Sequence, residues 1–321
     1  MQSSKFNTPL VTVGMVTYNS APFINEAIES VLSSSYDNFE LIIIDDASID
    51  NTWDIIKKYK DPRIISSRNE RNLGEYTNRN KIIDKSSGEY LIYIDGDDMI
   101  YPHGLEIMTI FLHAFPNSGM ALMRWYKKNI FYPIEMSPEQ YFKAVFFNYG
   151  LDDISFANTF FRVDALRKIG HFPTDFVFGD SYARLKIGAA NNVLLISDGL
   201  TWWRETIGQA SSVHSKNINS IISLYKFRFS LINSSEAPLN QSEKRDAEVN
   251  LKREISRYTI SFIKSFKFYS AIKIVIQFKI SLIDLIGYRR AFITKDPFEI
   301  HTPHDPARVK VELNPFSNIN G

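Results

Sequence analysis

Apolar residues along the first hundred positions recur in two patterns, which predict helices alternating with strands. Ile24, Ala27, Ile28 and Val31 follow the spacing of an amphipathic helix, whereas short continuous apolar runs predict buried strands. The predicted strands are Leu10–Val16, Phe39–Ile44, Arg63–Ser67 and Tyr90–Ile94, and the predicted helices are Ala21–Ser34, Trp53–Tyr59, Asn78–Lys85 and Gly104–Phe115. This alternation favours an α/β fold, in which a mostly parallel sheet is covered on both faces through right-handed crossovers.

The pattern becomes mixed after residue 100. Shorter strands and loops continue to about residue 214, and beyond it the chain turns helical and basic. Residues 273–286 also alternate as a strand would, so helix and strand both remain open there. Residues 296–321 are rich in Pro and Asn and predict an extended tail. At 321 residues, the chain is expected to form one large domain with an appendage.

Composition narrows the class of protein. A hydrophobic content of 44% is ample for a packed core and excludes a disordered chain. A net charge of +1 gives no indication of a nucleic-acid partner, and the absence of cysteine excludes disulfides and Cys-ligated metal sites. The N-terminus lacks a signal-peptide pattern, and the apolar stretch 271–288 contains charged residues. We therefore expect a cytoplasmic protein, at most peripheral at the inner face of the membrane.

A local charge imbalance lies near the C-terminus. Residues 255–295 contain eight basic side chains and a single acidic one, Asp284, interleaved with Phe and Ile. This composition predicts an amphipathic basic surface, which suits an anionic membrane or an acidic partner. A solvated face of a packed helical appendage explains the same pattern equally well.

Polar residues follow three of the predicted strands where each strand ends. The carboxyl ends of parallel strands meet at one edge of a sheet, where ligands bind. Neighbouring carboxylates repel one another unless donors or a cation compensate, and divalent metals prefer such oxygen ligands. Helix or turn caps are the alternative for any single cluster, but three at one edge favour a ligand site. The clusters are Thr17-Tyr18-Asn19, Asp45-Asp46 and Asp95-Gly96-Asp97-Asp98.

Six stretches in order resemble the family 2 glycosyltransferases with the nucleotide-binding GT-A fold, over roughly residues 8–212. The resemblance implies a glycosyltransferase domain at 1–214, with a donor-binding half at about 8–100 and an acceptor-side half at 101–214. The residues that follow predict a basic, mainly helical appendage at 215–295. The stretches are PLVTVGMVTYNSAPFINEAIESVLSSSYDNFELIIIDDASIDNT, RNERNLGEYTNRN, GEYLIYIDGDD, NTFFRVDALRKIGHF, FGDSYARLKIG and LTWWRETIGQASS.

The resemblance also implies roles for individual residues. Asp97 and Asp98 would reach a divalent metal, Mg²⁺ or Mn²⁺, that stabilises the leaving diphosphate. Asp180 would take the proton of the acceptor hydroxyl, and a single displacement would invert the anomeric centre. From the residues alone, Asp180 is also explained as the cap of a helix over Ser181–Ile187. The implied donor-binding residues are Thr17, Tyr18, Asn19, Asp46 at the uracil, Arg79, and Asp95 at the ribose or sugar.

Two positions depart from the family pattern. The family usually has Arg where this chain has Lys186, and Lys lacks the bidentate geometry of Arg. A His usually follows the Arg that corresponds to Arg204, whereas here the nearest is His214. These residues are candidates for diphosphate or acceptor contacts, as are Trp202 and Trp203, of which we expect one to be buried and one to stack on an acceptor sugar.

The predicted function is a metal-dependent, inverting sugar transfer from a nucleotide-diphosphate donor, with UDP favoured, to a hydroxyl of a glycan or lipid-linked acceptor in surface polysaccharide or lipopolysaccharide synthesis. The Gln-x-x-Arg-Trp element of processive members does not follow Asp180, which favours addition of one sugar per visit. A non-catalytic nucleotide- or glycan-binding protein with the same fold is the main alternative. A sugar nucleotidyltransferase is less favoured, because VTYNSAPF lacks the glycines of that class.

Overall fold

The structure, a computed structural model, describes residues 8–124, 132–147, 151, 154–205, 217–287 and 292–294. An eight-stranded sheet in the order β3-β2-β1-β4-β8-β6-β9-β7 forms its centre, and β5 and β10 pair separately. The strands are β1 (Val11–Thr17), β2 (Phe39–Asp45), β3 (Ile64–Arg68), β4 (Tyr90–Tyr93), β5 (Met99–Ile100), β6 (Ser118–Met123), β7 (Ile134–Met136), β8 (Thr159–Arg162), β9 (Asn192–Ile196) and β10 (Thr201–Trp202).

Helices cover both faces of this sheet and form the C-terminal region. They are α1 (Ile24–Leu32), α2 (Thr52–Ile56), α3 (Glu75–Lys85), α4 (Gly104–Ala114), α5 (Pro138–Phe146), α6 (Val163–Lys168), α7 (Gly179–Ala190), α9 (Ile218–Asn233), α10 (Gln241–Lys264), α11 (Phe268–Phe278) and α12 (Leu282–Ile286), with a short 3₁₀ turn at Phe156–Asn158. The α/β fold with a helical C-terminal region is confirmed, and every element predicted before residue 116 is present.

Strand directions differ between the two halves of the sheet. Strands β3, β2, β1 and β4 are parallel, as the alternation of strands and helices predicts. Strand β8 runs antiparallel to both β4 and β6, and β7 runs antiparallel to β9. The mostly parallel sheet that we expected is therefore confirmed; its antiparallel members are β8, which is inserted between two strands that run in the opposite direction, and β7 at the edge.

Successive residues of each strand contribute to two hydrophobic clusters, one on each face. In β2, Leu41 and Ile43 pack with α1, α2 and α4, whereas Ile42 and Ile44 pack with α3 and the elements on that side. The continuous apolar run LIII, residues 41–44, is what a strand buried on both faces requires. This packing fixes the strand ends, and therefore the loops that carry the polar clusters.

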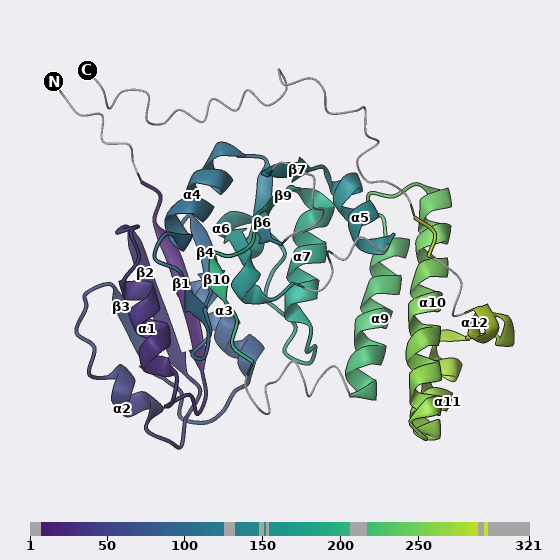
Figure 1. Cartoon of the computed structure of the whole chain (residues 1–321), viewed down its shortest axis with the longest axis horizontal. Helices are drawn as coiled ribbons and strands as arrows, with labels where there is room; N and C mark the ends of the chain where they lie inside the picture. Colours follow the sequence, from purple (N-terminus) through teal and green to yellow (C-terminus); the bar gives the residue numbers. More distant parts are fainter. Residues whose placement is uncertain are drawn as a thin grey trace.

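Helices α9–α12 form a block beside the sheet (Figure 1) and share its larger cluster. Lys143 of α5 pairs with Glu243 of α10 at 3.0 Å, and Asn250 donates to the carbonyl of Phe146 at 3.1 Å. Residues 268–278 and 282–286 are helical, so the strand alternative for 273–286 is wrong. Within the described ranges, no helix is long and apolar enough to cross a membrane.

Candidate functional site

The three polar clusters lie at the carboxyl edge of the parallel strands. Thr17 at the end of β1 aligns with Asp45 at the end of β2, and Asp46 N donates to the carbonyl of Thr17 at 2.9 Å. Gly96 N reaches the carbonyl of Val16 at 3.2 Å, which brings the loop after β4 to the same edge. The sheet thus gathers segments that lie about eighty residues apart, as the parallel topology predicts.

Gly96 allows this loop to approach β1 closely. A Cβ atom at Gly96 would lie 2.6 Å from Oγ1 of Thr17, so a larger residue would push the aspartate loop away from the strand. Thr17 Oγ1 itself is buried and has no hydrogen-bond partner among the described residues. Because Gly96 has no side chain, the carboxylates that follow it lie close to β1.

Asn19 joins the loops after β1 and β2. Its Oδ1 accepts from Ile49 N and its own N–H donates to Ser48 Oγ, both at 2.9 Å, and its φ of 53° is in the left-handed region that Asn tolerates. Asp45 is fully buried, accepts from Ser48 N at 3.2 Å and pairs with Arg68. Asp45 therefore stabilises the turn after β2 through these contacts, as the alternative of a turn cap predicted. Tyr18 beside them is about half exposed.

Asp46 is buried and accepts three hydrogen bonds from one loop. Its oxygens accept from Asn69 Nδ2 at 2.7 Å, Leu73 N at 2.8 Å and Gly74 N at 2.9 Å. Burial opposes ionisation, but these hydrogen bonds outweigh it and lower the pKa of Asp46. Asp46 thus anchors the loop that leads into α3, in addition to any contact with a nucleotide base.

Arg79 on α3 is buried and paired with two carboxylates. Its Nη2 donates to Glu75 Oε1 at 2.8 Å and to Asp95 Oδ2 at 2.6 Å. The guanidinium also lies 4.7 Å from the ring centroid of Tyr93 and 4.1 Å from that of Phe156. Burial opposes its charge, but Asp95 and Glu75 outweigh that effect and raise the pKa of Arg79. Arg79 therefore remains a fixed positive charge beside the aspartate loop.

Glu75 is a site residue that the sequence analysis missed. It begins α3, and its pKa is raised by burial and by the negative charges of Asp95 and Asp180, against the lowering effect of Arg79. The i,i+4 spacing of Glu75 and Arg79 was a visible signal for their ion pair. The proximity of Asp180 had no sequence signal, because it depends on how α3 and α7 pack.

Asp180 lies in the first turn of α7, close to the first turn of α3. The backbone of Gly179 packs on Tyr76, where a Cβ atom would lie 2.2 Å from the ring. Asp180 accepts from Ser181 N at 2.7 Å and lies 3.4 Å from Nη1 of buried Arg184. The helix starts at Gly179, so Asp180 is inside it and is not its N-cap; the capping alternative is wrong in this detail.

Asp98 is buried beside two other carboxylates. Burial, together with the negative charges of Asp95 and Asp97, raises the pKa of Asp98 to about 8, although the N–H of Arg204 donates to it at 3.1 Å. A buried carboxylate with this repulsion would be stabilised by a cation. A cation beside Asp98 would therefore favour its ionised form.

Arg204 holds the aspartate loop from the other side. Strand β10 pairs with β5, which directly follows the loop. Arg204 Nε donates to the carbonyl of Asp97 at 3.0 Å, and its Nη2 pairs with Glu26 of α1 at 2.6 Å. This contact joins residues 107 positions apart and ties the loop to α1.

Trp202 and Trp203 are both 39% exposed, so the expectation that one of them is buried in the core is wrong. The short β10 belongs to a two-stranded sheet that is separate from the eight-stranded one, and both indoles there are partly exposed. The ring of Trp202 lies 4.6 Å from the guanidinium of Arg204. Lys186 forms an ion pair with Glu236, beside the C-terminal helices. His214 lies outside the described residues.

The residues fit a divalent metal that is shared with a ligand. No three His, Asp or Glu side chains of the described ranges converge to enclose an ion by themselves. However, Thr17 Oγ1, Arg79 Nη1 and Asp95 Oδ1 are buried polar atoms without a partner there. Mg²⁺ and Mn²⁺ commonly bind through one or two carboxylates plus substrate phosphates, which suits an incomplete protein ligand set of this kind.

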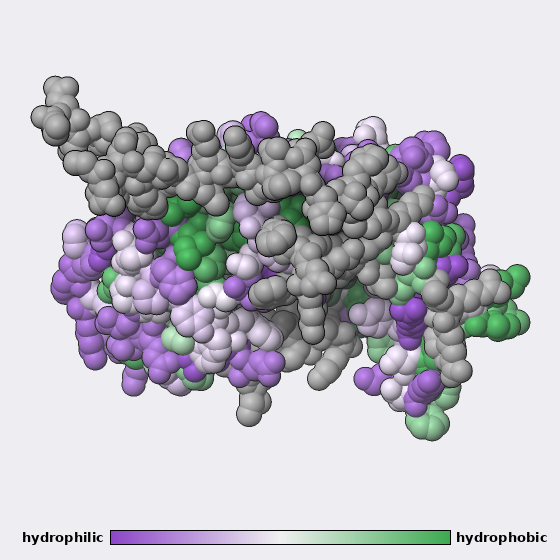
Figure 2. Space-filling view, turned by 45° about the horizontal axis from the view of Figure 1, so that its top comes forward, coloured by the Kyte–Doolittle hydropathy of each residue, from purple (hydrophilic) through white to green (hydrophobic). Residues whose placement is uncertain are grey.

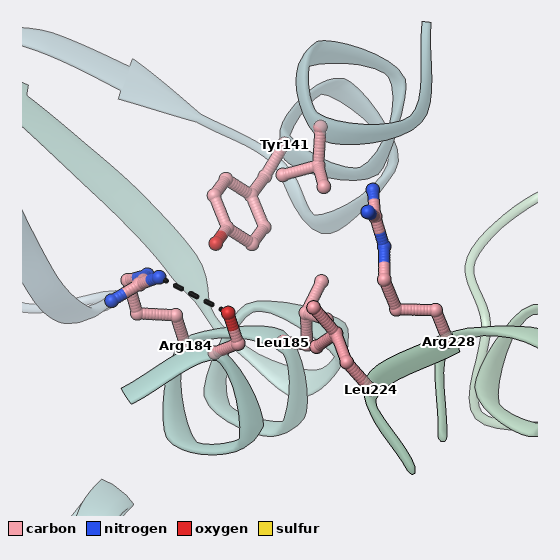
Figure 3. Close-up of a pocket in the computed structure, with 7 residues that line it drawn as sticks. Tyr141, Arg184, Leu185, Leu224 and Arg228 are labelled. Atoms are coloured by element: carbon pink, nitrogen blue, oxygen red, sulfur yellow. Dashed lines mark hydrogen bonds between the residues drawn. The ribbon is translucent and has the colours of Figure 1, made fainter. Parts of the chain in front are cut away.

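A small cavity lies behind Asp180, between α5, α7 and α9. Arg184 and Arg228 are on opposite sides of it, and Arg184 contacts Ser181 (Figure 3). Its volume of about 30 Å³ suits one or two water molecules and is too small for a sugar. This cavity is therefore not a donor or acceptor site.

Curated relatives match the first part of the chain. "Putative teichuronic acid biosynthesis glycosyltransferase TuaG" of Bacillus subtilis is 36% identical over 121 residues, 36% of this chain and 48% of TuaG. "UDP-Glc:alpha-D-GlcNAc-diphosphoundecaprenol beta-1,3-glucosyltransferase WfaP" of Escherichia coli is 43% identical over 89 residues, 28% of this chain and 36% of WfaP. The chain thus spans about half or less of the length of these relatives.

Solved structures match over most of the chain. TarS 1–349 of S. aureus in complex with UDP-GlcNAc gives a TM-score of 0.64 at 20% identity, over 87% of this chain and 81% of that one. The mannosyltransferase PcManGT of Pyrobaculum calidifontis, in complex with GDP-Man and Mn²⁺, gives 0.60 at 18%, over 88% and 79%. These matches show the GT-A fold. The model of the family described as "Glycosyl transferase family 2" matches residues 12–170. Through that region, which includes all three polar clusters, the chain belongs to glycosyl transferase family 2.

Proposed function

We propose that the protein transfers a sugar from a nucleotide-diphosphate donor to a hydroxyl group with inversion. The observation that carries this proposal is a row of charged side chains between the aspartate loop and Asp180. Arg79 forms ion pairs with Asp95 and Glu75. The charge of Asp95 raises the pKa of Asp98, and the charge of Asp180 raises the pKa of Glu75. This row lies between the groups that would hold the donor and the group that would act on the acceptor.

The donor would bind at the carboxyl edge of the sheet. Asp97 and Asp98 would hold Mg²⁺ or Mn²⁺, which when bound neutralises charge on the leaving diphosphate. The complexes of TarS with UDP-GlcNAc and of PcManGT with GDP-Man and Mn²⁺ support a nucleotide-sugar donor and a metal, and we favour UDP. The remaining donor contacts in this proposal come from Thr17, Tyr18, Asn19, Asp46, Arg79 and Asp95.

Asp180 would act as the general base. The acceptor oxygen forms a bond to the anomeric carbon as the bond from that carbon to the diphosphate breaks, and the hydroxyl proton moves to Asp180. Arg184 and the Ser181 N–H orient the carboxylate. Glu75 would act as a positioning residue, because it connects Arg79 to the neighbourhood of Asp180. The two exposed indoles, Trp202 and Trp203, suit stacking on an acceptor sugar.

The acceptor class is inferred from relatives. TuaG is named for teichuronic acid biosynthesis, and WfaP for an acceptor linked to diphosphoundecaprenol. We propose a glycan or lipid-linked acceptor in cell-surface polysaccharide synthesis, extended by one sugar per visit. The lack of a Gln-x-x-Arg-Trp element after Asp180 supports the non-processive mode.

Calorimetric titration of UDP, GDP, dTDP and CDP, with and without Mn²⁺, tests the donor site. Wild type is expected to bind one nucleotide in a metal-dependent way, and Asp97→Ala/Asp98→Ala is expected to lose that binding. The exposed pair Asp54→Ala/Asp164→Ala makes the same change in charge and should bind as wild type does. If no nucleotide binds under any condition, the aspartates are a structural loop and the proposal fails.

Asp180→Asn separates catalysis from binding. The variant should retain nucleotide affinity but lose roughly 10²- to 10⁴-fold in transfer or donor hydrolysis, the usual contribution of a general base. Nucleotide binding by wild type without transfer to any glycan or lipid-linked acceptor would instead favour the non-catalytic binding protein.

A further inference from the structure

The C-terminal helices expose a large apolar surface. In α11, in α12 and in the turn before α11, eight Phe, Tyr, Ile and Leu side chains are between 53% and 81% exposed, more than scattered surface apolar residues explain. The space-filling view shows hydrophobic residues of α12 at the right edge of the molecule (Figure 2). We name this the α11–α12 surface; it consists of Phe266, Phe268, Tyr269, Ile272, Ile276, Leu282, Ile283 and Ile286.

Helix α11 is apolar on two faces, and only one of them is buried. Ala271 and Ile274 are buried, and Ile274 belongs to the core shared with α10 and the sheet. Tyr269, Ile272 and Ile276, spaced by three and four residues, form a second stripe in solvent. A helix with two apolar faces is normally covered on both, so the outer stripe indicates a second apolar partner.

Basic side chains surround this stripe. Lys264, Lys267 and Lys279 are exposed beside it. Among residues 257–287 there are five basic side chains and one acidic side chain, Asp284, whose carboxylate accepts from Ser281 N. Apolar residues between lysines match the boundary of an anionic bilayer, where side chains enter the acyl region and lysines meet headgroups.

The apolar side chains and the lysines beside them together indicate the chemistry of the partner. We propose that the α11–α12 surface rests on an anionic lipid bilayer, with its outer stripe inserted and its lysines at the headgroups. This inference stands apart from the proposed sugar transfer and does not depend on it.

Co-sedimentation with vesicles tests the inference. Wild type is expected to bind vesicles of an equal mixture of phosphatidylcholine and phosphatidylglycerol, and to bind phosphatidylcholine alone weakly. Ile272→Ser/Ile276→Ser should weaken binding by roughly tenfold for each isoleucine. Lys264→Gln/Lys267→Gln/Lys279→Gln should weaken it by roughly fivefold for each lysine, and added salt should act in the same direction.

Matched variants test whether a loss of vesicle binding is specific to the α11–α12 surface or follows from removing any exposed lysine or isoleucine. Ile49→Ser removes an isoleucine that is 87% exposed on the sheet domain, and Lys57→Gln/Lys58→Gln/Lys60→Gln removes three exposed lysines there. Both should bind vesicles as wild type does, and circular dichroism checks that every variant is folded. Equal binding of wild type and the Ile272/Ile276 variant would overturn the inference. A dimer in sedimentation velocity that these two changes dissociate, without vesicle binding, would overturn it in favour of a second copy of the chain.

Discussion

Asp46 and Arg79 are both buried charges, but they are stabilised by different partners. Asp46 accepts hydrogen bonds from Asn69 and from two backbone N–H groups, so its charge is balanced by dipoles. Arg79 is balanced by the carboxylates of Glu75 and Asp95 and by two aromatic rings. The dipoles around Asp46 belong to the loop that it anchors. The ion pairs of Arg79, in contrast, would be altered by a ligand that brings further charges to the site.

Asp46→Asn is expected to lower the free energy of unfolding by about 1–3 kcal/mol at neutral pH. Both carboxylate oxygens accept hydrogen bonds from N–H groups, and in the variant an amide NH₂ group, itself a donor, would face one of these donors. The folded pKa is lowered, so the contribution of Asp46 is complete above its unfolded pKa of about 4 and is lost as pH falls through the folded pKa. In urea unfolding, the difference between wild type and variant should therefore shrink on acidification. The exposed Asp54→Asn is the control, and a difference that does not vary with pH would contradict this account.

At the scale of elements, the packing of α3 against α7 determines where Asp180 lies. Gly179 leaves no space between the backbone of α7 and the ring of Tyr76, whose hydroxyl donates to the carbonyl of Val177 at 2.8 Å. The first turns of two helices, with Glu75 and Asp180, meet at this contact. Their positive dipole ends favour carboxylates there.

Gly179→Ala should therefore displace the start of α7, cost about 1–3 kcal/mol of stability and lower the transfer rate more than nucleotide affinity. Gly188→Ala is the matched control, because its Cβ would lie 2.3 Å from Tyr141 in the same helix, toward α5. It should lose similar stability with a smaller effect on transfer. Equal loss of transfer in both variants would mean that the Tyr76 contact does not position Asp180.

Sequence periodicity predicted the elements of the first 115 residues, because each buries one stripe or run of apolar side chains. It did not predict the antiparallel insertion of β8 or the β5–β10 pair, since these depend on contacts between distant segments. The sequence showed the polar clusters at the strand ends. It did not show that Glu75 and Asp180 lie close enough for their charges to interact. Residues 273–286 were ambiguous because α11 is apolar on two faces, which blurs the helical period.

At the scale of the whole molecule, one hydrophobic cluster joins the sheet to the C-terminal helices. It includes Leu91 of β4 and Leu185 of α7 together with Leu251 and Ile255 of α10. The helices therefore stabilise the same core as the elements that hold the site. A shared core predicts that both regions unfold in one cooperative transition.

Leu251→Ala should lower the free energy of unfolding by about 2–5 kcal/mol, because Leu251 is buried. All four tryptophans precede residue 204, so their fluorescence reports the sheet region alone. The tryptophan midpoint in urea should nevertheless fall in this variant. Val249→Ala, at a more exposed position of α10, should shift it little. An unchanged tryptophan midpoint in Leu251→Ala would show that the two regions unfold independently.

The shared cluster also has a genetic consequence. A premature stop codon early in α10 would remove Leu251 and Ile255 and uncover the parts of this cluster on α5 and α9, against which α10 packs. Such an allele would abolish the site even though every residue assigned to it is still encoded. Missense changes in the C-terminal helices and in the strands should therefore be equally damaging wherever they fall on this cluster.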